Sequence, residues 1–123
     1  MRKAKILVVD DEQDYLRIAC LLLKQEGYDI QTAATGKKGF ELAVNHQPDL
    51  VILDIGLPDI DGIEVSRMLQ ENSRTSKTRV IFFSVYSDLG HLRRALYGRK
   101  QKYIIKPFDP EELIRKVKES LSD

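Results

Sequence analysis

The sequence predicts an α/β fold in which helices cover both faces of a parallel five-stranded sheet. Three observations support this prediction. Short apolar runs alternate five times with amphipathic stretches of helical period. The runs at 5–9, 50–54 and 79–84 are apolar almost throughout, which is typical of strands buried on both faces. The connections are short, with no linker, repeat or low-complexity segment.

The first two strands have different patterns. Residues 5–9 form a continuous apolar run, and a helix is predicted over 15–25 because its apolar residues recur on one face. Gly27 is the type of residue that ends a helix. The strand at 28–33 alternates polar and apolar residues, so we expect it at an edge of the sheet.

Helix-start signals mark the next two units. Thr35 is expected to cap a helix that ends before Pro48. The apolar strand at 50–54 follows. Asp61 is then expected to be the N-cap of a third helix, with Glu64 completing a capping box.

The last two units follow a polar connection. Residues 79–84 form an apolar strand, and a helix is expected over 87–97. The strand at 103–108 leads into the last helix, which has Asp109 as N-cap and Pro110 in its first position.

Few sheet topologies satisfy these patterns. Right-handed crossovers and an edge position for the second strand favour the order 2-1-3-4-5, in which the apolar first, third and fourth strands are central. We therefore expect a flavodoxin-like, doubly wound (βα)5 three-layer sandwich. Residues 1–123 fit one domain.

Composition and charge exclude several classes of protein. With 42% hydrophobic and 32% charged residues, the chain is typical of globular rather than disordered proteins. Its net charge of +1 does not indicate nucleic-acid binding, and no apolar run approaches the roughly 20 residues that span a bilayer. The single cysteine, Cys20, excludes an internal disulfide and suits a reducing compartment. We expect a cytoplasmic protein that neither enters a membrane nor binds nucleic acid directly.

Polar residues that carry chemistry stand at the carboxyl ends of four predicted strands. They are Asp10, Asp11, Asp54, Ser84 and Lys106. Any one of them alone is as easily explained as the start of a loop. In a parallel sheet, however, these ends meet at one edge, where ligands bind near the reversal of strand order. Their convergence from distant parts of the chain favours a functional site.

The residue types at this edge indicate phosphoryl chemistry with a divalent cation. Three neighbouring carboxylates repel one another unless a cation is present or one of them takes a proton. Oxygen ligands without a nearby His or Cys favour a hard cation, Mg²⁺ first, with Mn²⁺ as a substitute. A carboxylate nucleophile, a lysine and a hydroxyl would complete a site for a transferring phosphoryl group. The chain has no Walker loop and no Gly-x-Gly-x-x-Gly motif, so a nucleotide is not the evident ligand.

In their order and spacing, these motifs resemble the receiver domain of two-component response regulators. The resemblance covers essentially the whole chain, from about residue 5 to residue 121. The matching motifs are Val8-Val9-Asp10-Asp11-Glu12, Asp54-x-x-Leu57-Pro58-x-x-Asp61-Gly62, Ser84 after an apolar strand, and Lys106-Pro107-Phe108. Each motif alone is weak evidence, but the set is very specific.

The resemblance implies that Asp54 accepts a phosphoryl group from a phosphohistidine on a sensor histidine kinase or a histidine phosphotransfer protein. The direct Mg²⁺ ligands would be Asp11, Asp54 and the backbone carbonyl of Gly56, and Asp10 would act through metal-bound water. Such a domain assists its own phosphorylation and dephosphorylation, and is a signalling module rather than an enzyme.

The resemblance also implies a conformational switch. Ser84 and Lys106 would contact the phosphoryl oxygens, with Ser84 moving toward them, and Tyr103 would rotate inward. Without the family, Tyr103 is simply a half-buried strand aromatic. The output face would comprise the fourth helix, fifth strand and fifth helix, and could form a homodimer. The Lys106–Pro107 bond is expected to be cis, as only about 5–6% of X-Pro bonds are.

Two features depart from the family pattern. Val85, where a small residue is usual, and Tyr86 follow the switch hydroxyl; together with Gly56 they are expected to influence how long the phosphoryl group persists. Residues 93–102 contain five Lys or Arg and no acid. This stretch is either a solvated basic face or a surface for an acidic partner. The acids of a second copy that could meet it are Glu111, Glu112 and Glu119.

Two other classes share part of this chemistry. A phosphohydrolase of the haloacid-dehalogenase type also uses an aspartate nucleophile, Mg²⁺ and a lysine, but its Asp-x-Asp motif follows the first strand. A receiver-like module that binds without phosphorylation would lack a site residue, and none is missing. An effector domain or separate output protein is expected outside this sequence, so the chain is either a stand-alone regulator or part of a longer protein.

Overall fold

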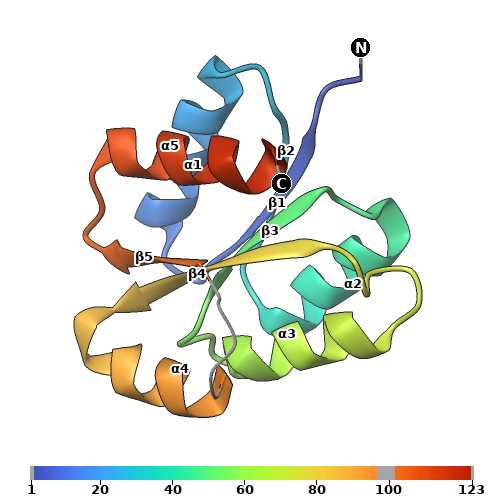
Figure 1. The fold of residues 1–123 in the computed structure, drawn as a ribbon, viewed down its shortest axis with the longest axis vertical. Coiled ribbons are helices and arrows are strands. Elements are labelled where there is room, and N and C mark those ends of the chain that lie inside the picture. Colours follow the sequence, from blue (N-terminus) through green and yellow to red (C-terminus); the bar gives the residue numbers. More distant parts are fainter. Residues whose placement is uncertain (1, 97–101, 123) are drawn as a thin grey trace.

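The computed structural model describes residues 2–96 and 102–122 and has a three-layer α/β architecture (Figure 1). Within these residues, five strands form one sheet in the order β2-β1-β3-β4-β5. Every neighbouring pair is parallel, which confirms the predicted flavodoxin-like topology. The strands are β1 (Lys5–Val9), β2 (Asp29–Ala33), β3 (Leu50–Asp54), β4 (Arg79–Val85) and β5 (Lys102–Lys106).

Helices cover both faces of the sheet, as Figure 1 shows. On one face lie α1 (Gln13–Gln25) and α5 (Pro110–Ser122). On the other lie α2 (Gly36–His46), α3 (Gly62–Glu71) and α4 (Leu89–Leu96). A single 3-10 turn, η1 (Tyr86–Asp88), precedes α4. None of the described helices combines the length and the apolar character needed to cross a bilayer.

The alternation of side chains along each strand divides the core in two. In β1, Ile6 and Val8 pack in the cluster under α1 and α5, whereas Leu7 and Val9 pack in the cluster under α2, α3 and α4. Because both faces are covered, the central strands are apolar at almost every position. The edge strand β2 is only partly buried, as its alternating sequence predicts.

Most helix boundaries follow their sequence signals. Three predicted N-caps accept a hydrogen bond from a backbone amide two or three residues ahead, over 2.7–3.1 Å; they are Thr35, Asp61 and Asp109. Gly27 has a φ of 92°, in the left-handed region that suits the residue after a helix. The predicted capping box at Glu64 is wrong, because the guanidinium of Arg67 donates to both oxygens of that carboxylate.

Boundaries around the last strand also differ from the prediction. β5 ends at Lys106 rather than at 108, because Pro107 has no amide to continue the ladder. The Lys106–Pro107 bond is cis, as expected. The fourth helix begins at Leu89, after the 3-10 turn, rather than at 87. Its predicted end at 97 lies outside the described residues, as does the part of the basic stretch at 97–101.

Candidate functional site

The predicted site residues come from strand ends at the carboxyl edge of the sheet. Asp10 directly follows β1, and its amide donates to the carbonyl of Ala33 at the end of β2 over 3.0 Å. Asp54 and Lys106 are the last residues of β3 and β5, and Ser84 is the second-last residue of β4. The parallel register therefore brings residues from four strands to one edge.

A glycine allows α3 to start directly against the end of β3. The amide of Gly62 donates to the carbonyl of Ile55 over 2.9 Å. A Cβ at position 62 would overlap the carbonyl of Asp54 and would lie 2.8 Å from Ile55 Cα. The same loop is attached to α2, since the carboxylate of Asp59 accepts from the first two amides of that helix over 2.8 and 2.9 Å. The backbone on the C-terminal side of Asp54 is thus held on two sides.

The ammonium group of Lys106 lies among three carboxylates. Its Nζ is 2.7 Å from Asp10 Oδ2, 3.0 Å from Glu12 Oε1 and 3.5 Å from Asp54 Oδ1. The side chains of Lys106 and Asp10 are 2% and 0% exposed, and that of Asp54 is 9% exposed. Charges buried to this extent are costly unless they are paired, so the ammonium group is what keeps these acids together.

Aromatic rings form a wall beside this ammonium group. Lys106 Nζ lies 4.5 Å from the ring centre of Tyr15 and 5.7 Å from that of Phe83. The rings of Phe83 and Phe108 stack with their centres 5.4 Å apart. The rings reduce solvent access and attract the cation through their faces, so they restrict where the Lys106 head group can lie.

The two titrating partners of the site have shifted pKa values. Burial and the charge of Asp10 raise the pKa of Asp54 to about 6, although Lys106 and the amide of Gly56 act in the opposite direction. Burial alone would lower the pKa of Lys106, but its contacts with Asp10, Glu12 and Asp54 outweigh this effect and raise it. Lys106 therefore stays charged, while Asp54 carries a negative charge that is incompletely stabilised and that a further cation would favour.

The donor set fits a hard divalent cation. Within the described part of the chain, Asp10, Glu12 and Asp54 can each bring one oxygen to within 4.8 Å of the others. The three acids share the ammonium group of Lys106, which lies 2.7 Å from Asp10 Oδ2. Three carboxylates carry more negative charge than one ammonium group neutralises, so a further cation fits here, and an all-oxygen set suits Mg²⁺.

Glu12, rather than Asp11, reaches the centre of the site. Asp11, which the resemblance makes a direct metal ligand, is exposed and is not among the three converging acids. Glu12 belongs to the Val8-Val9-Asp10-Asp11-Glu12 motif, but no role was predicted for it. Its place at the start of α1, directly after two acids, was the available signal.

The two predicted switch residues have other partners. Ser84 is buried, and its hydroxyl donates to the carbonyl of Val85 over 2.9 Å. Tyr103 is half-buried against the cluster under α2, α3 and α4. Lys116 Nζ donates to the carbonyl of Tyr103 over 2.7 Å and lies 5.4 Å from its ring centre. Each residue is thus engaged by its own strand or by α5.

Gly56 leaves space beside Asp54. The amide of Gly56 donates to Asp54 Oδ1 over 3.3 Å, and among the described residues no atom beyond its chain neighbours lies within 4 Å of the position that its Cβ would take. Val85 is exposed, at 40% of its surface. The side chain of Tyr86, the third residue expected to affect the lifetime of the phosphoryl group, lies outside the described part of the structure.

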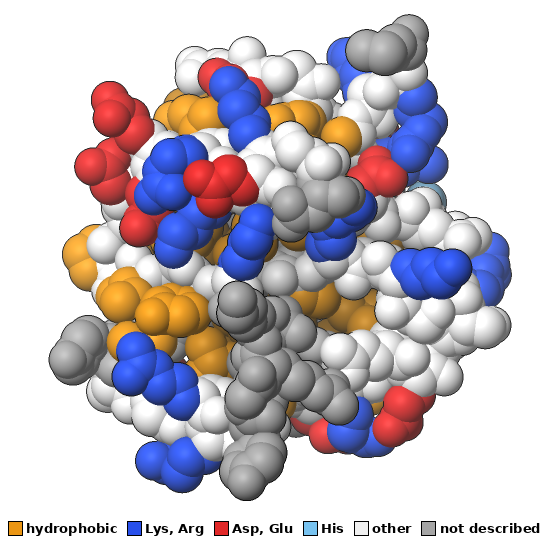
Figure 2. Space-filling view, viewed as in Figure 1, with side chains coloured by type: hydrophobic (Ala, Val, Ile, Leu, Met, Phe, Trp, Pro, Cys, Tyr) orange, Lys and Arg blue, Asp and Glu red, His pale blue; other side chains and the backbone are white. Residues whose placement is uncertain are grey.

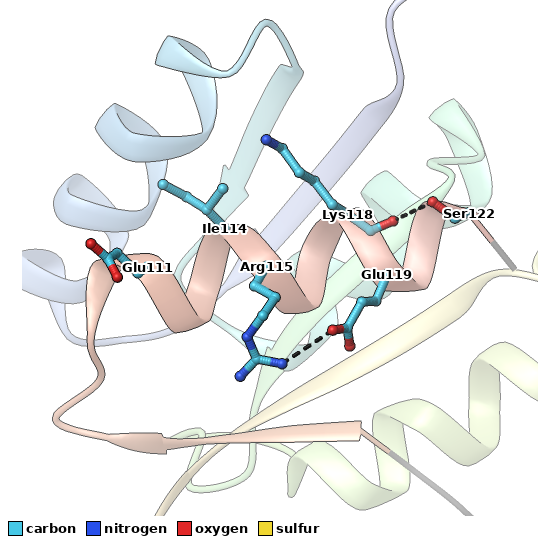
Figure 3. A pocket seen from close by; sticks show the side chains of 6 residues that line it. All are labelled: Glu111, Ile114, Arg115, Lys118, Glu119 and Ser122. Carbon is cyan, nitrogen blue, oxygen red and sulfur yellow. Dashed lines mark hydrogen bonds and ion pairs between the residues drawn. The ribbon is translucent and has the colours of Figure 1, made fainter.

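A separate hollow of about 600 Å³ runs along α5 and contains none of the site residues (Figure 3). All its lining residues belong to this one helix: Glu111, Ile114, Arg115, Lys118, Glu119 and Ser122. Arg115 pairs with Glu119 over 3.1 Å inside it. It is therefore a furrow between side chains of one helix rather than a ligand pocket.

The predicted output face is mixed in character. Figure 2 shows Lys and Arg side chains over α4 and over α5, with hydrophobic side chains between the two helices. Arg93 and Arg94 are exposed on α4. Near the C-terminal end of α5, Lys118 pairs with Glu26, the residue that follows α1, over 2.9 Å. The exposed charges on α4 keep both interpretations of the basic stretch open.

Comparison with known proteins gives a consistent result. The family model described as response regulator receiver domain matches residues 6–118. Response regulator ArlR of Staphylococcus saprophyticus is 38% identical over 95% of this chain and 52% of its own length. The DNA-binding dual master transcriptional regulator RpaA of Synechocystis is 34% identical over 93% of this chain and 47% of its own length. The chain thus spans about half the length of these curated relatives.

Solved structures agree. A CheY-like response regulator receiver domain protein from Methanospirillum hungatei superposes with a TM-score of 0.89 at 30% identity, covering 98% of this chain and 95% of the other. DrrB, a Thermotoga maritima OmpR/PhoB homolog, superposes with a TM-score of 0.83 at 32% identity, covering 98% of this chain and 54% of the other.

Proposed function

Because the chain belongs to the response regulator receiver domain family, we propose that it is a phosphoacceptor that takes a phosphoryl group from a phosphohistidine onto Asp54. The donor is a sensor histidine kinase or a histidine phosphotransfer protein. Residues 1–123 form a single receiver domain in this proposal, acting in the cytoplasm. The observation that carries the proposal is the buried group of Asp10, Asp54 and Lys106 at the carboxyl edge of the sheet.

The raised pKa of Asp54 supports its role as the acceptor. Burial and the charge of Asp10 make the Asp54 carboxylate more basic and therefore a better nucleophile toward phosphorus. The product is an acyl phosphate, and the cations of the site balance the negative charge that it adds. In the transfer, the bond between phosphorus and the donor nitrogen breaks while an Asp54 oxygen forms a new bond to phosphorus. The electron pair of the broken bond stays on the imidazole, which leaves.

The remaining site residues act on the charge of the transferring group. Lys106 pairs with the phosphoryl oxygens, and Ser84 donates its hydroxyl to them after releasing the carbonyl of Val85. Asp11, Asp54 and the carbonyl of Gly56 would hold Mg²⁺ directly, and Asp10 would hold it through water. When bound, Mg²⁺ neutralises charge that develops on the phosphoryl oxygens.

Phosphorylation changes the conformation of the output face formed by α4, β5 and α5. Movement of Ser84 frees space into which Tyr103 turns, and Tyr103 already connects β5 to α5 through Lys116. A homodimer through this face, or an effector domain or separate output protein, would receive the change. The lifetime of the phosphoryl group is set by access of water past Gly56, Val85 and Tyr86.

Acetyl phosphate with Mg²⁺, followed by intact mass measurement, tests this function. The wild type should gain the mass of one phosphoryl group, and Asp54→Ala should gain none. Asp59→Ala removes a carboxylate from the same loop without touching Lys106 and should still be phosphorylated. Modification that survives in Asp54→Ala would place the acceptor elsewhere and overturn the proposal.

A further inference from the structure

Glu12 accepts a hydrogen bond from the buried ammonium group of Lys106. Lys106 Nζ donates to Glu12 Oε1 over 3.0 Å, although the two residues are 94 positions apart. Lys106 Nζ also pairs with Asp10 Oδ2 over 2.7 Å. Asp10 therefore holds the ammonium group from the buried side, and Glu12 holds it from the exposed side.

The backbone of Glu12 is held in the place from which its side chain contacts Lys106. Glu12 is the N-cap residue of α1, where a side chain usually accepts from the helix's own amides, and its carboxylate makes no such bond. Instead its amide donates to Asp10 Oδ1 over 3.0 Å, which ties the residue to the site. The carboxylate of Glu12 therefore does not cap α1 and binds Lys106 instead.

The three carboxylates differ in what they lose when they leave the ammonium group. A lysine ammonium has three N–H donors, and three acids surround it here. Asp10 and Asp54 are nearly inaccessible to water, whereas the side chain of Glu12 is 54% exposed. Glu12 can thus leave at the lowest cost, because water can solvate it.

We infer that Glu12 is a positioning residue whose carboxylate occupies, on Lys106, the place that a phosphoryl oxygen takes during transfer. The inference rests on the proposed function. An incoming phosphoryl group then competes with Glu12 for the ammonium group, and phosphorylation includes the release of the Lys106–Glu12 ion pair. Glu12 consequently lowers the apparent affinity of the site for its phosphodonor.

Two substitutions weaken the contact between Glu12 and Lys106 in different ways. Glu12→Gln keeps the length of the side chain and removes its charge, while Glu12→Asp keeps the charge and is one methylene too short to hold the contact. The KM for acetyl phosphate at fixed Mg²⁺ should fall about threefold in both variants, the scale of a half-exposed ion pair, with kcat little changed. Glu119→Gln removes a similarly exposed acid, paired with Arg115 on α5, and should leave KM unchanged.

A second measurement does not depend on turnover. In the metal-free protein, the NMR signal of the Lys106 ε-methylene group should shift in both Glu12 variants and stay in place in Glu119→Gln. An unchanged KM in both Glu12 variants, or a wild-type KM in Glu12→Asp alone, would overturn the inference while leaving the proposed function intact. Absence of phosphoryl incorporation in the wild type would instead overturn the proposed function.

Discussion

Asp49 and Asp54 stand at opposite ends of the same strand and have opposite pKa shifts. Asp49, immediately before β3, accepts two hydrogen bonds from the guanidinium of Arg2, over 2.9 and 3.1 Å, and one from the amide of Lys5 over 2.7 Å. These bonds lower the pKa of Asp49, Arg2 contributing most, against a smaller effect of burial. Burial and the charge of Asp10 raise the pKa of Asp54 to about 6.

The difference shows how one residue type is used for structure at one end and for chemistry at the other. The charge of Asp49 is satisfied by donors that belong to the fold, so nothing further is needed there. Asp54 receives one weak amide bond, at 3.3 Å, and shares one ammonium group with two other acids. Its deficit of donors is what a divalent cation can offset.

The largest effect should come from Gly62→Ala, which acts on the Asp54 end of β3 alone. The added methyl overlaps the carbonyl of Asp54, so either α3 or the strand end must move. We expect a loss of about 3 kcal/mol in the free energy of unfolding, measured by urea denaturation, and slower phosphorylation. Gly56→Ala is the matched control, because its methyl meets no atom of the described residues within 4 Å beyond its chain neighbours and should cost little. Equal losses in the two variants would contradict this account of the turn.

Asp54→Asn should stabilise the metal-free protein. The substitution removes a buried charge and its repulsion from Asp10, and it loses the smaller attraction to Lys106. Because the folded pKa of Asp54, about 6, lies above the unfolded value of 3.8, the wild type loses stability as the pH rises through this interval. We expect a gain of about 1–2 kcal/mol at pH 7.5 that disappears by about pH 4. Urea denaturation over this pH range measures it, and an equal gain at both pH values would contradict the assigned pKa.

The sequence predicts the backbone arrangement of the site better than the conformations of its side chains. Strand order and register depend on apolar patterning, so the meeting of Asp10, Asp54 and Lys106 could be expected before any coordinates were known. The partner of Ser84 could not, because one χ1 rotation decides whether its hydroxyl faces the site or the carbonyl of Val85. The contact between Glu12 and Lys106 could not be predicted for a similar reason. The backbone position of Glu12 is that of a helix cap, and its side-chain rotamer alone decides that it contacts Lys106.

Asp49→Asn should have the opposite sign to Asp54→Asn. The variant weakens two hydrogen bonds from Arg2 and one from the Lys5 amide, and we expect it to lower the free energy of unfolding by about 0.5–1 kcal/mol at pH 7.5. Because the folded pKa of Asp49 is depressed, this contribution is present above its unfolded pKa and is lost only as the pH falls through the folded value. The two Asn variants should therefore converge on the wild type at acid pH from opposite sides. Stabilisation by Asp49→Asn at neutral pH would contradict a purely structural role for this end of the strand.

The smallest effect concerns Mg²⁺, and it separates the two ends most directly. A ligand that binds only the folded state stabilises it by about 0.4 kcal/mol when its free concentration equals the dissociation constant. Mg²⁺ should raise the melting temperature of the wild type and of Asp49→Asn equally, because Asp49 already has its donors and lies at the far end of β3. In Asp54→Asn, a neutral amide replaces one carboxylate of the converging set, and the increase should shrink or vanish. Calorimetric melting with and without Mg²⁺, with Na⁺ at matched ionic strength as the control, measures the difference. If the increase persisted in Asp54→Asn but was lost in Asp49→Asn, the donor deficit at Asp54 could not be what binds the ion.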